Sequence, residues 1–343
     1  MSSTSATDRY SRQTLFKPIG KDGQERLRAS SVALIGCGAL GSTLANNLCR
    51  AGIGRLVIAD RDYVEINNLQ RQILFDEDDI ARRLPKAIAA AEKLRRINSE
   101  VAVEALVEDI NSDGIEALVQ DVDLVLDATD NFATRYLLND ACIKHGRPWI
   151  YSGVIASYGV TLNIIPGETP CLRCIYPEMP LPGTTATCDT AGILNGIVGT
   201  ITGIASTEAL KILLKSDRVS RDMLWIDVWE NTSERIELPR YPDCPACGQH
   251  HYEFLDMLTG TDTTSLCGRD AVQVRSGKRG ENINLPDLAE RLRPVGQVSF
   301  NAYLLRLLVD GYDVTVFPDA RAIIKGTDNE MVARSIYARY IGN

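Results

Sequence analysis

The chain has 343 residues, 45% of them hydrophobic and 24% charged, with a formal net charge of −8. This composition is ordinary for a globular protein, and a moderate negative charge without any basic run excludes nucleic acid as a main partner. The polar N-terminal stretch MSSTSATDRYSRQ is unlike a secretory signal, and no stretch reaches the roughly 18 apolar residues of a membrane span. We therefore expect a cytoplasmic protein without a membrane partner.

After a polar arm that we expect to carry a short helix, residues 32–60 read VALIGCGALGSTLANNLCRAGIGRLVIAD and predict a strand, a glycine turn, a helix and a second strand. Gly36, Gly38 and Gly41 have the G-x-G-x-x-G spacing of a phosphate-binding turn, in which backbone N–H groups at a helix N-terminus face the anion. Asp60 ends the second strand, where a carboxylate can accept hydrogen bonds from a ribose. This segment predicts a nucleotide site without saying which nucleotide binds.

The following segments alternate between strand and helix patterns before the topology changes character. A polar loop, a helix, a strand, a weak helix, a strand, a helix and a strand are predicted over 61–85, 86–97, 101–107, 114–120, 122–128, 132–145 and 149–152. Two later strands, 158–165 and 223–229, indicate an antiparallel extension of the sheet. Between them, 193–214 predicts a helix that carries Gly196, Gly199 and Gly203 at close-packing intervals, which we interpret as a buried core helix.

Together these elements predict an α/β protein. Its main part is a Rossmann-like mixed sheet, with a parallel nucleotide-binding half and an antiparallel extension, and a small α+β domain follows. We expect an N-terminal arm and helix over 1–29, the nucleotide-binding domain over 30–250, a linker over 251–265 and the small domain over 266–343. Strand, helix, strand, strand and helix are predicted in the small domain.

Four charged residues outside the glycine turn are candidates to surround bound phosphates: Arg12, Arg71, Lys86 and Asp130. A dinucleotide needs one pyrophosphate neutralised, largely by backbone and helix dipole, whereas a triphosphate with magnesium needs several cations and a carboxylate. The number of charges therefore favours a triphosphate. Each of the four, taken alone, is equally compatible with a solvated surface charge.

Five cysteines are candidates for chemistry. Cys171 and Cys174, in PCLRC, and Cys244 and Cys247, in CPACG, form two Cys-x-x-Cys pairs that suit a closed tetrahedral zinc site. The gap between the pairs is wide, so the spacing leaves two unrelated pairs or a redox motif open. Cys188, in TCDTAG, precedes the long helix and is a candidate nucleophile, because a helix N-terminus lowers the pKa of a thiol. An ordinary cysteine of the capping region is the alternative.

Dispersed motifs over about residues 8–248 resemble those of the ThiF/MoeB family, the bacterial adenylating enzymes related to ubiquitin-activating enzymes. The motifs are RYSRQ at 9–13, GCGALGS at 36–42, D-x-D at 60–62, NNLQRQ at 67–72, LPK at 84–86 and ATDN at 128–131. The resemblance implies an ATP-dependent adenylyltransferase. Its substrate would be a ubiquitin-like sulfur carrier protein ending in Gly-Gly, whose C-terminal carboxylate becomes an acyl-adenylate as pyrophosphate leaves.

The resemblance also implies roles for single residues of the nucleotide site. Asp60 would hold the ribose, Arg71 and Lys86 would grip the phosphates, and Asn68 and Gln72 would shape the pocket. The full set of expected nucleotide-binding residues is Gly36, Gly38, Gly41, Asp60, Asp62, Asn68, Arg71, Gln72, Lys86, Asp130 and Asn131.

Metal ions and a second subunit are implied as well. Asp130 would bind Mg²⁺. The family has the same two cysteine pairs, which favours Zn²⁺ at the four cysteines. Arg12 would reach into the site of the partner subunit, which implies a homodimer. In ThiF-like members the cysteine that matches Cys188 takes part in a covalent, sulfur-linked step with the carrier, and a cysteine desulfurase is a candidate sulfur source.

Two segments favour a role in thiamine thiazole synthesis: TCDTAG, which contains Cys188, and the C-terminal extension, which contains CGR at residues 267–269. Activation of a molybdopterin-type carrier, as in MoeB, is the alternative. A Rossmann NAD-dependent oxidoreductase would explain the glycine turn but would leave Arg71, Lys86, Asp130 and the cysteine pairs without a role. A non-catalytic dimeric scaffold that binds a ubiquitin-like partner would not need the full charged set.

Overall fold

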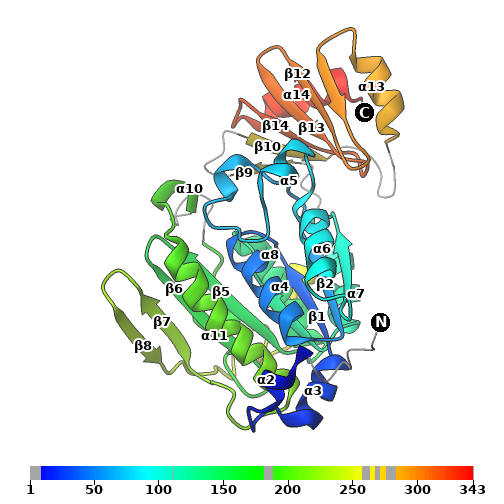
Figure 1. Ribbon diagram of the computed structural model, residues 1–343. Coiled ribbons are helices and arrows are strands. Elements are labelled where there is room, and N and C mark those ends of the chain that lie inside the picture. The colour runs from blue at the N-terminus through cyan, green and yellow to red at the C-terminus, as the bar shows by residue number, and fades with distance from the viewer. Residues whose placement is uncertain are drawn as a thin grey trace, which may run out of the picture. The chain divides into compact units, whose positions relative to one another are not determined.

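The computed structural model describes residues 9–110, 112–180, 188–256, 263–266, 271–275 and 283–342 (Figure 1). The chain divides into two compact units. The first comprises Met1–Pro180 and Ala191–Leu258, and the second comprises Leu181–Thr190 and Thr259–Asn343. Each unit has its own sheet, and the two are described separately.

The first unit contains an eight-stranded sheet in the order β3-β2-β1-β4-β5-β6-β7-β8. Its strands are β1 (Ser31–Ile35), β2 (Arg55–Ala59), β3 (Ala102–Leu106), β4 (Leu124–Asp127), β5 (Trp149–Ile155), β6 (Tyr158–Ile164), β7 (Met223–Asp227) and β8 (Thr232–Ile236). β1 to β5 pair in parallel, and β6, β7 and β8 add antiparallel strands to β5. The predicted mixed Rossmann-like sheet is confirmed.

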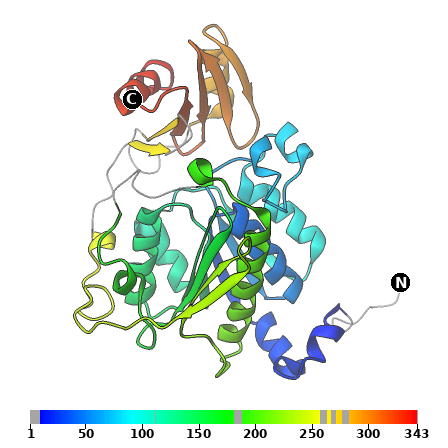
Figure 2. The same cartoon turned by 90° about the vertical axis from the view of Figure 1, so that its left-hand side faces the viewer.

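Helices cover both faces of this sheet (Figure 2). The helices of this unit are α2 (Ser11–Thr14), α3 (Gly20–Arg28), α4 (Ala39–Ala51), the 3₁₀ helix η1 (Ile66–Asn68), α5 (Glu77–Ala81), α6 (Lys86–Ile97), α7 (Ser112–Gln120), α8 (Phe132–Lys144), α9 (Leu172–Ile175), α11 (Asn195–Leu213) and α12 (Glu253–Asp256). The short helix α10 (Cys188–Ala191) falls mostly in the second unit. α4 contacts both α6 and α11, whereas α7 contacts α8. Ala33 and Ile35 of β1 pack into the core on the α7–α8 side, so the alternating residues Val32 and Leu34 face α4.

The predicted elements of this unit are close to those observed. The helix predicted over 86–97 is α6, and α4 ends at Gly52, whose φ of +78° is the left-handed conformation expected of a C-terminal glycine. The segment predicted to be a loop contains η1 and α5, because Asp76 accepts hydrogen bonds from the N–H groups of Asp78 and Asp79 and so begins a short helix.

The expectation for the glycines of the long helix α11 was wrong. Ile197, Val198 and Ile201 are buried, but Gly196, Gly199 and Gly203 lie on the exposed side, and an added Cβ at Gly199 or Gly203 would meet no atom within 4 Å. Glycines three or four residues apart define a helix face that another element can approach closely, but they do not say whether that element belongs to the same chain.

The same helix has the length and apolar composition of a membrane span, which the sequence had not been expected to contain. Among the described residues it is the single helix to do so, with a mean hydropathy of 1.2 over its most apolar 18-residue window, half of which is buried inside the fold. Core helices of soluble proteins have the same composition.

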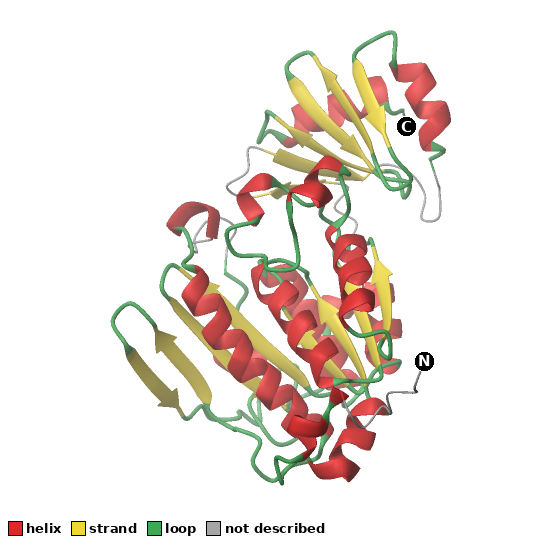
Figure 3. Ribbon diagram, viewed as in Figure 1, coloured by secondary structure: helices red, strands yellow, loops and turns green. Residues whose placement is uncertain are grey.

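The second unit has a six-stranded antiparallel sheet in the order β11-β12-β13-β14-β10-β9 (Figure 3). Its elements are β9 (Thr263–Leu266), β10 (Ala271–Arg275), α13 (Leu285–Leu292), β11 (Gln297–Phe300), β12 (Leu305–Val309), β13 (Tyr312–Val316), β14 (Arg321–Lys325) and α14 (Glu330–Tyr340). The sequence had predicted three strands here. β12 and β13 are separated only by Asp310 and Gly311, both with positive φ, so a tight hairpin divides what reads as one apolar run.

The carboxyl end of β4 holds a buried ion pair that shapes the following loop. Arg135 of α8 donates from Nε to Oδ2 of Asp127 over 3.0 Å and from Nη2 to the carbonyl oxygen of Thr129 over 2.7 Å. The N–H and hydroxyl groups of Thr129 donate to Oδ1 of Asp127. Burial raises the pKa of Asp127 although these partners oppose the shift. The pair therefore fixes the loop that carries Asp130.

Replacing Arg135 with methionine should destabilise the protein strongly, because Asp127 would stay buried without its counter-charge. We expect the free energy of unfolding to fall by about 3–5 kcal/mol in urea titration. The matched control is Arg221→Met, which removes an exposed ion pair with Glu168 and should cost no more than about 1 kcal/mol. Equal losses in the two variants would show that the buried pair has no special role.

Candidate functional site

The glycine turn joins β1 to α4 and creates a position for an anion. Gly36 has a φ of +89°, and a Cβ at this position would lie 2.6 Å from the carbonyl oxygen of Ala128. A Cβ on Gly41 would collide with the carbonyl oxygen of Gly36. No side chain of the described ranges caps α4, so the N–H groups of its first turn are available to a phosphate.

Asp60, predicted to hold a ribose, also braces this turn. Its Oδ2 accepts a hydrogen bond of 2.6 Å from the backbone N–H of Cys37, and its Oδ1 accepts one of 2.7 Å from the N–H of Asp62. Burial raises the pKa of Asp60, while the neighbouring Lys86 ammonium opposes the shift. Each carboxylate oxygen keeps a further lone pair for a hydroxyl group of a ligand.

Asp62 and Lys86 form an ion pair beside the turn. Nζ of Lys86 lies 3.0 Å from Oδ2 of Asp62, and the backbone N–H of Lys86 donates to the carbonyl oxygen of Asp62. Lys86 is only 4% exposed. The N–H of Val64 donates to the carbonyl oxygen of Leu84, so the LPK motif is tied to the segment after β2. The two motifs predicted to act on one nucleotide therefore lie together.

Arg61 and Asp109 belong to the same charged group, and sequence reasoning missed both. Nη1 of Arg61 donates to Oδ1 and Oδ2 of Asp109 over 3.0 and 3.1 Å. Although burial acts to lower the pKa of Arg61, the carboxylates of Asp109, Asp62 and Asp130 raise it. The available signal was the position of Arg61 within D-x-D and of Asp109 just after a strand, since the ends of neighbouring parallel strands meet at one edge.

The NNLQRQ motif lies against the glycine turn through one buried side chain. Gln72 is 3% exposed, and its Nε2 would lie 3.8 Å from a Cβ on Gly38. Its Oε1 is buried and has no hydrogen-bond partner within the described part of the chain. A buried amide oxygen without a partner suits a site that a polar ligand completes.

The other predicted residues of this motif have structural contacts. Oδ1 of Asn68 accepts a hydrogen bond from the N–H of Glu65, the N-cap residue of η1. Arg71 is half-buried and donates from Nη1 to the carbonyl oxygen of Asn67 over 2.8 Å. Its remaining guanidinium donors are compatible with the predicted phosphate contact.

In the ATDN motif, Asp130 and Asn131 have different surroundings. Asp130 is exposed and close enough to Arg61 and Arg135 to affect the pKa of each. Oδ1 of Asn131 accepts a 2.8 Å hydrogen bond from the N–H of Thr134 and caps α8. A single exposed carboxylate fits Mg²⁺, which usually takes one or two protein carboxylates together with substrate phosphates. The oxygen of Asn131 is already occupied by the helix cap.

Arg12 does not join this group. It is exposed on α2, and the neighbouring Gln13 donates from Nε2 to the carbonyl oxygen of Ala51, at the last residue of α4. The glycine turn lies at the other end of that helix, which spans about 20 Å for its 13 residues. The structure therefore places Arg12 far from the nucleotide site of its own chain.

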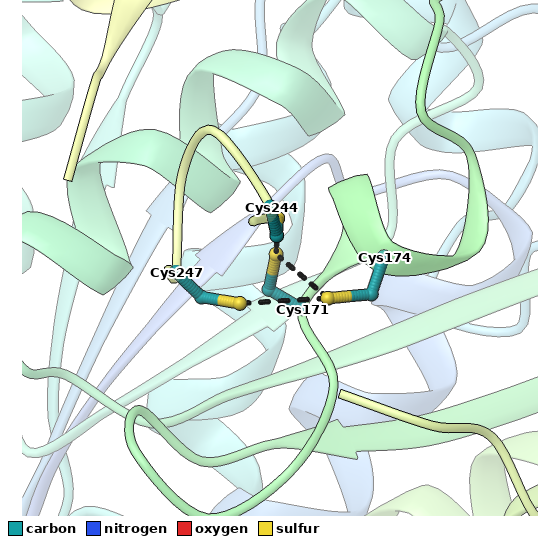
Figure 4. A group of neighbouring side chains, drawn as sticks. All are labelled: Cys171, Cys174, Cys244 and Cys247. Carbon is teal, nitrogen blue, oxygen red and sulfur yellow. Dashed lines mark hydrogen bonds between the residues drawn. The ribbon is translucent and has the colours of Figure 1, made fainter. Parts of the chain in front are cut away.

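Cys171, Cys174, Cys244 and Cys247 come together as predicted (Figure 4). The Sγ atoms are all buried and within 4.8 Å of one another, with 3.6 Å between Cys171 and Cys244 and 3.4 Å between Cys174 and Cys247. A tetrahedral zinc with Zn–S bonds of 2.3 Å needs sulfur atoms about 3.8 Å apart. The thiols of Cys171 and Cys174 lower the pKa of Cys247 to about 6. This closed thiol set could hold a metal ion such as zinc.

The side chains of two further cysteines, Cys188 and Cys267, are not among the described residues. Cys188 begins α10, whereas all of Cys267 lies outside the described ranges. Cys37, Cys49 and Cys142 are buried.

Comparisons with known proteins agree with this geometry. Residues 10–246 match the model of the ThiF family. A Sulfur carrier protein ThiS adenylyltransferase of Bacillus subtilis is 43% identical over 98% of this chain and 100% of its own length. A SAMP-activating enzyme E1 of Haloferax volcanii is 39% identical over 76% of this chain and 95% of its own. The fold is shared with E. coli MccB, at 23% identity and a TM-score of 0.62 over 72% of this chain and 74% of that one. The chain belongs to the ThiF family.

Proposed function

We propose that the chain is an ATP-dependent adenylyltransferase that activates the C-terminal glycine carboxylate of a ubiquitin-like sulfur carrier protein. The observation that carries the proposal is the meeting of Asp60, Lys86, Gln72 and Asp130 around the glycine turn. Asp60 suits a ribose, Lys86 a phosphate chain and Asp130 a metal ion. These residues come from segments far apart in the sequence. Relatives that are named adenylyltransferases support the same activity.

In this reaction the carrier carboxylate attacks the α-phosphate of ATP and pyrophosphate leaves. A carboxylate is already ionised near pH 7, so no general base is needed. The chain's own groups position and neutralise the phosphates: N–H groups of α4, the Lys86 ammonium and the Arg71 guanidinium. Magnesium, held by Asp130 together with the phosphates, would supply further neutralisation of the leaving pyrophosphate.

The chemistry visible here favours this proposal over a nicotinamide-dependent reaction. A dinucleotide has no need for the ion pair of Lys86 or the exposed carboxylate of Asp130. A non-catalytic scaffold is disfavoured for the same reason, since it would need neither Lys86 nor Asp130 beside the glycine turn.

The carrier is proposed to serve thiamine thiazole synthesis in the cytoplasm, with a cysteine desulfurase as the candidate source of sulfur. The support is the Bacillus subtilis relative, named for ThiS and similar over both units. A molybdopterin-type carrier is the second candidate, because several relatives are named MOCS3 adenylyltransferase and sulfurtransferase.

Weighing the products of the chain with ATP and carriers ending in Gly-Gly tests the proposal directly. The expected product is a carrier heavier by one adenylyl group, formed with the thiamine-type carrier. Asp130→Ala should lower carrier-dependent exchange between ATP and pyrophosphate by about 100-fold, since it removes the carboxylate that faces the metal. The exposed Asp217→Ala serves as the matched control. If wild-type protein adenylates no carrier, the proposed function is wrong.

The same mass measurement addresses Cys188, whose nucleophilic role stays a prediction. Cys188→Ala should keep the exchange reaction and lose any covalent adduct with the carrier. Loss of both, or of neither, would contradict a role confined to the sulfur-linked step.

A zinc ion at the four cysteines is the next part of the proposal. Metal analysis of freshly purified protein should find about one zinc per chain, and Cys244→Ser should lose it and lower the melting temperature, because a structural zinc contributes to folding. Cys142→Ala, at a buried cysteine outside the cluster, should keep the metal. Less than one zinc in the wild-type protein, with a normal melting temperature, would exclude a structural role.

We propose that the exposed side of α11 forms the homodimer interface. Gly199 and Gly203 present open backbone there, and α11 contacts α3, which follows the segment with Leu15 and Phe16, 71% and 61% exposed. Large exposed apolar side chains beside a small-residue helix face suit a second copy of the chain. A partner would also explain the position of Arg12, remote from its own nucleotide site.

Gly203→Leu should convert the dimer to a monomer without unfolding it. The new side chain meets open space within the chain but would keep the partner helix at a distance, and leucine is a better helix former than glycine. Analytical ultracentrifugation and circular dichroism measure the two effects. Arg96→Leu, an exposed position on α6, is the control for an added surface leucine. An unchanged dimer in Gly203→Leu would place the interface elsewhere.

A further inference from the structure

Four charged side chains form a continuous row at the carboxyl ends of β2 and β3. Asp109 accepts two hydrogen bonds from Nη1 of Arg61. Nε of Arg61 lies 4.0 Å from Oδ1 of Asp62, and Oδ2 of the same carboxylate lies 3.0 Å from Nζ of Lys86. The row therefore ends on the lysine that is proposed to grip the phosphates.

The ion pair between Lys86 and Asp62 creates a difficulty for phosphate binding. The Lys86 side chain is 5% exposed and the Asp62 side chain 19%, so solvent screens the pair only weakly. An ammonium that turns toward a phosphate must weaken or break its contact with the carboxylate. A poorly solvated carboxylate that loses an ammonium 3.0 Å away is destabilised, and this cost would oppose ATP binding.

Arg61 is placed to remove that cost. Because Asp109 holds Nη1, the Nε side of the guanidinium faces the second oxygen of Asp62. A 4.0 Å contact is long in the described state, in which Asp62 is paired with Lys86. It can shorten when Lys86 leaves, so that the total charge around Asp62 stays balanced.

We infer that Arg61, held in place by Asp109, is a positioning residue that becomes the ion-pair partner of Asp62 when Lys86 turns to the phosphates of ATP. Arg61 would not touch the nucleotide; it would act on ATP binding through Asp62. This inference rests on the proposed function, because Lys86 has phosphates to grip only if ATP is the substrate.

The test measures the dissociation constant of ATP for the full chain by calorimetry without carrier. Arg61→Met should weaken ATP binding roughly tenfold, the size of effect usual for directly coupled charges. Asp109→Asn, which leaves Arg61 in place but loosens its anchor, should weaken binding less, and Arg61→Lys should restore part of the loss. Thermal melts of each variant separate this effect from unfolding.

A double-mutant cycle with Asp62→Asn distinguishes the inference from a direct contact. Without the Asp62 charge, Lys86 is released, so Arg61→Met should have little further effect on ATP binding. If Arg61 instead touched the phosphates, its removal would weaken binding as much in Asp62→Asn as in the wild type. Additive effects would therefore overturn the inference.

The matched control is Arg55→Met. Arg55 of β2 binds Glu104 of β3 through Nε and Nη2 over 2.7 and 3.1 Å. It links the same two strands away from the carboxyl ends and should leave ATP binding unchanged. An unchanged dissociation constant in Arg61→Met, with normal carrier-dependent exchange in the wild type, would overturn this inference alone. Absence of exchange in the wild type would instead refute the proposed function.

Discussion

The contact between the glycine turn and the loop after β4 is the constraint on which the nucleotide site depends. Gly36 can face the carbonyl oxygen of Ala128 only because it has no Cβ, and the N–H of Ala128 donates back to the carbonyl oxygen of Ile35. The turn that presents α4 to an anion and the loop that carries Asp130 are thus one rigid unit. The buried pair of Asp127 and Arg135 extends that rigidity into α8.

Around this rigid unit three cations are already paired with carboxylates before any ligand arrives. Lys86 is bound to Asp62, Arg61 to Asp109, and Arg135 to Asp127. Preformed pairs keep the side chains ordered, so less conformational entropy is lost on binding. Their disadvantage is that an anionic substrate must compete with carboxylates for the same cations. A phosphate ligand must therefore offset the cost of separating Lys86 from Asp62.

Sequence reasoning succeeded where the signals are local. The apolar runs, the glycine spacing and the stop at Gly52 specify β1, α4 and β2 within a few residues. Each Cys-x-x-Cys pair could be recognised from its spacing, but grouping the two pairs into one site required the resemblance to the ThiF/MoeB family. Sequence reasoning failed where the burial of a helix face depends on which element packs against it. The glycine spacing on α11 is the same whether that element belongs to the same chain or to another one. The pairing of Arg61 with Asp109 required the strand order, which brings together loops 48 residues apart.

The cysteine cluster has one more consequence, for the chain between its two halves. A metal ion that ties Cys174 to Cys244 would close a loop of roughly 70 residues, which lowers the entropy term TΔS of the unfolded chain by about 4 kcal/mol. α10, α11, β7 and β8 all lie within that loop. A metal ion at the four cysteines would therefore stabilise more than the two cysteine turns, because β7 and β8 at the edge of the eight-stranded sheet belong to the same closed loop.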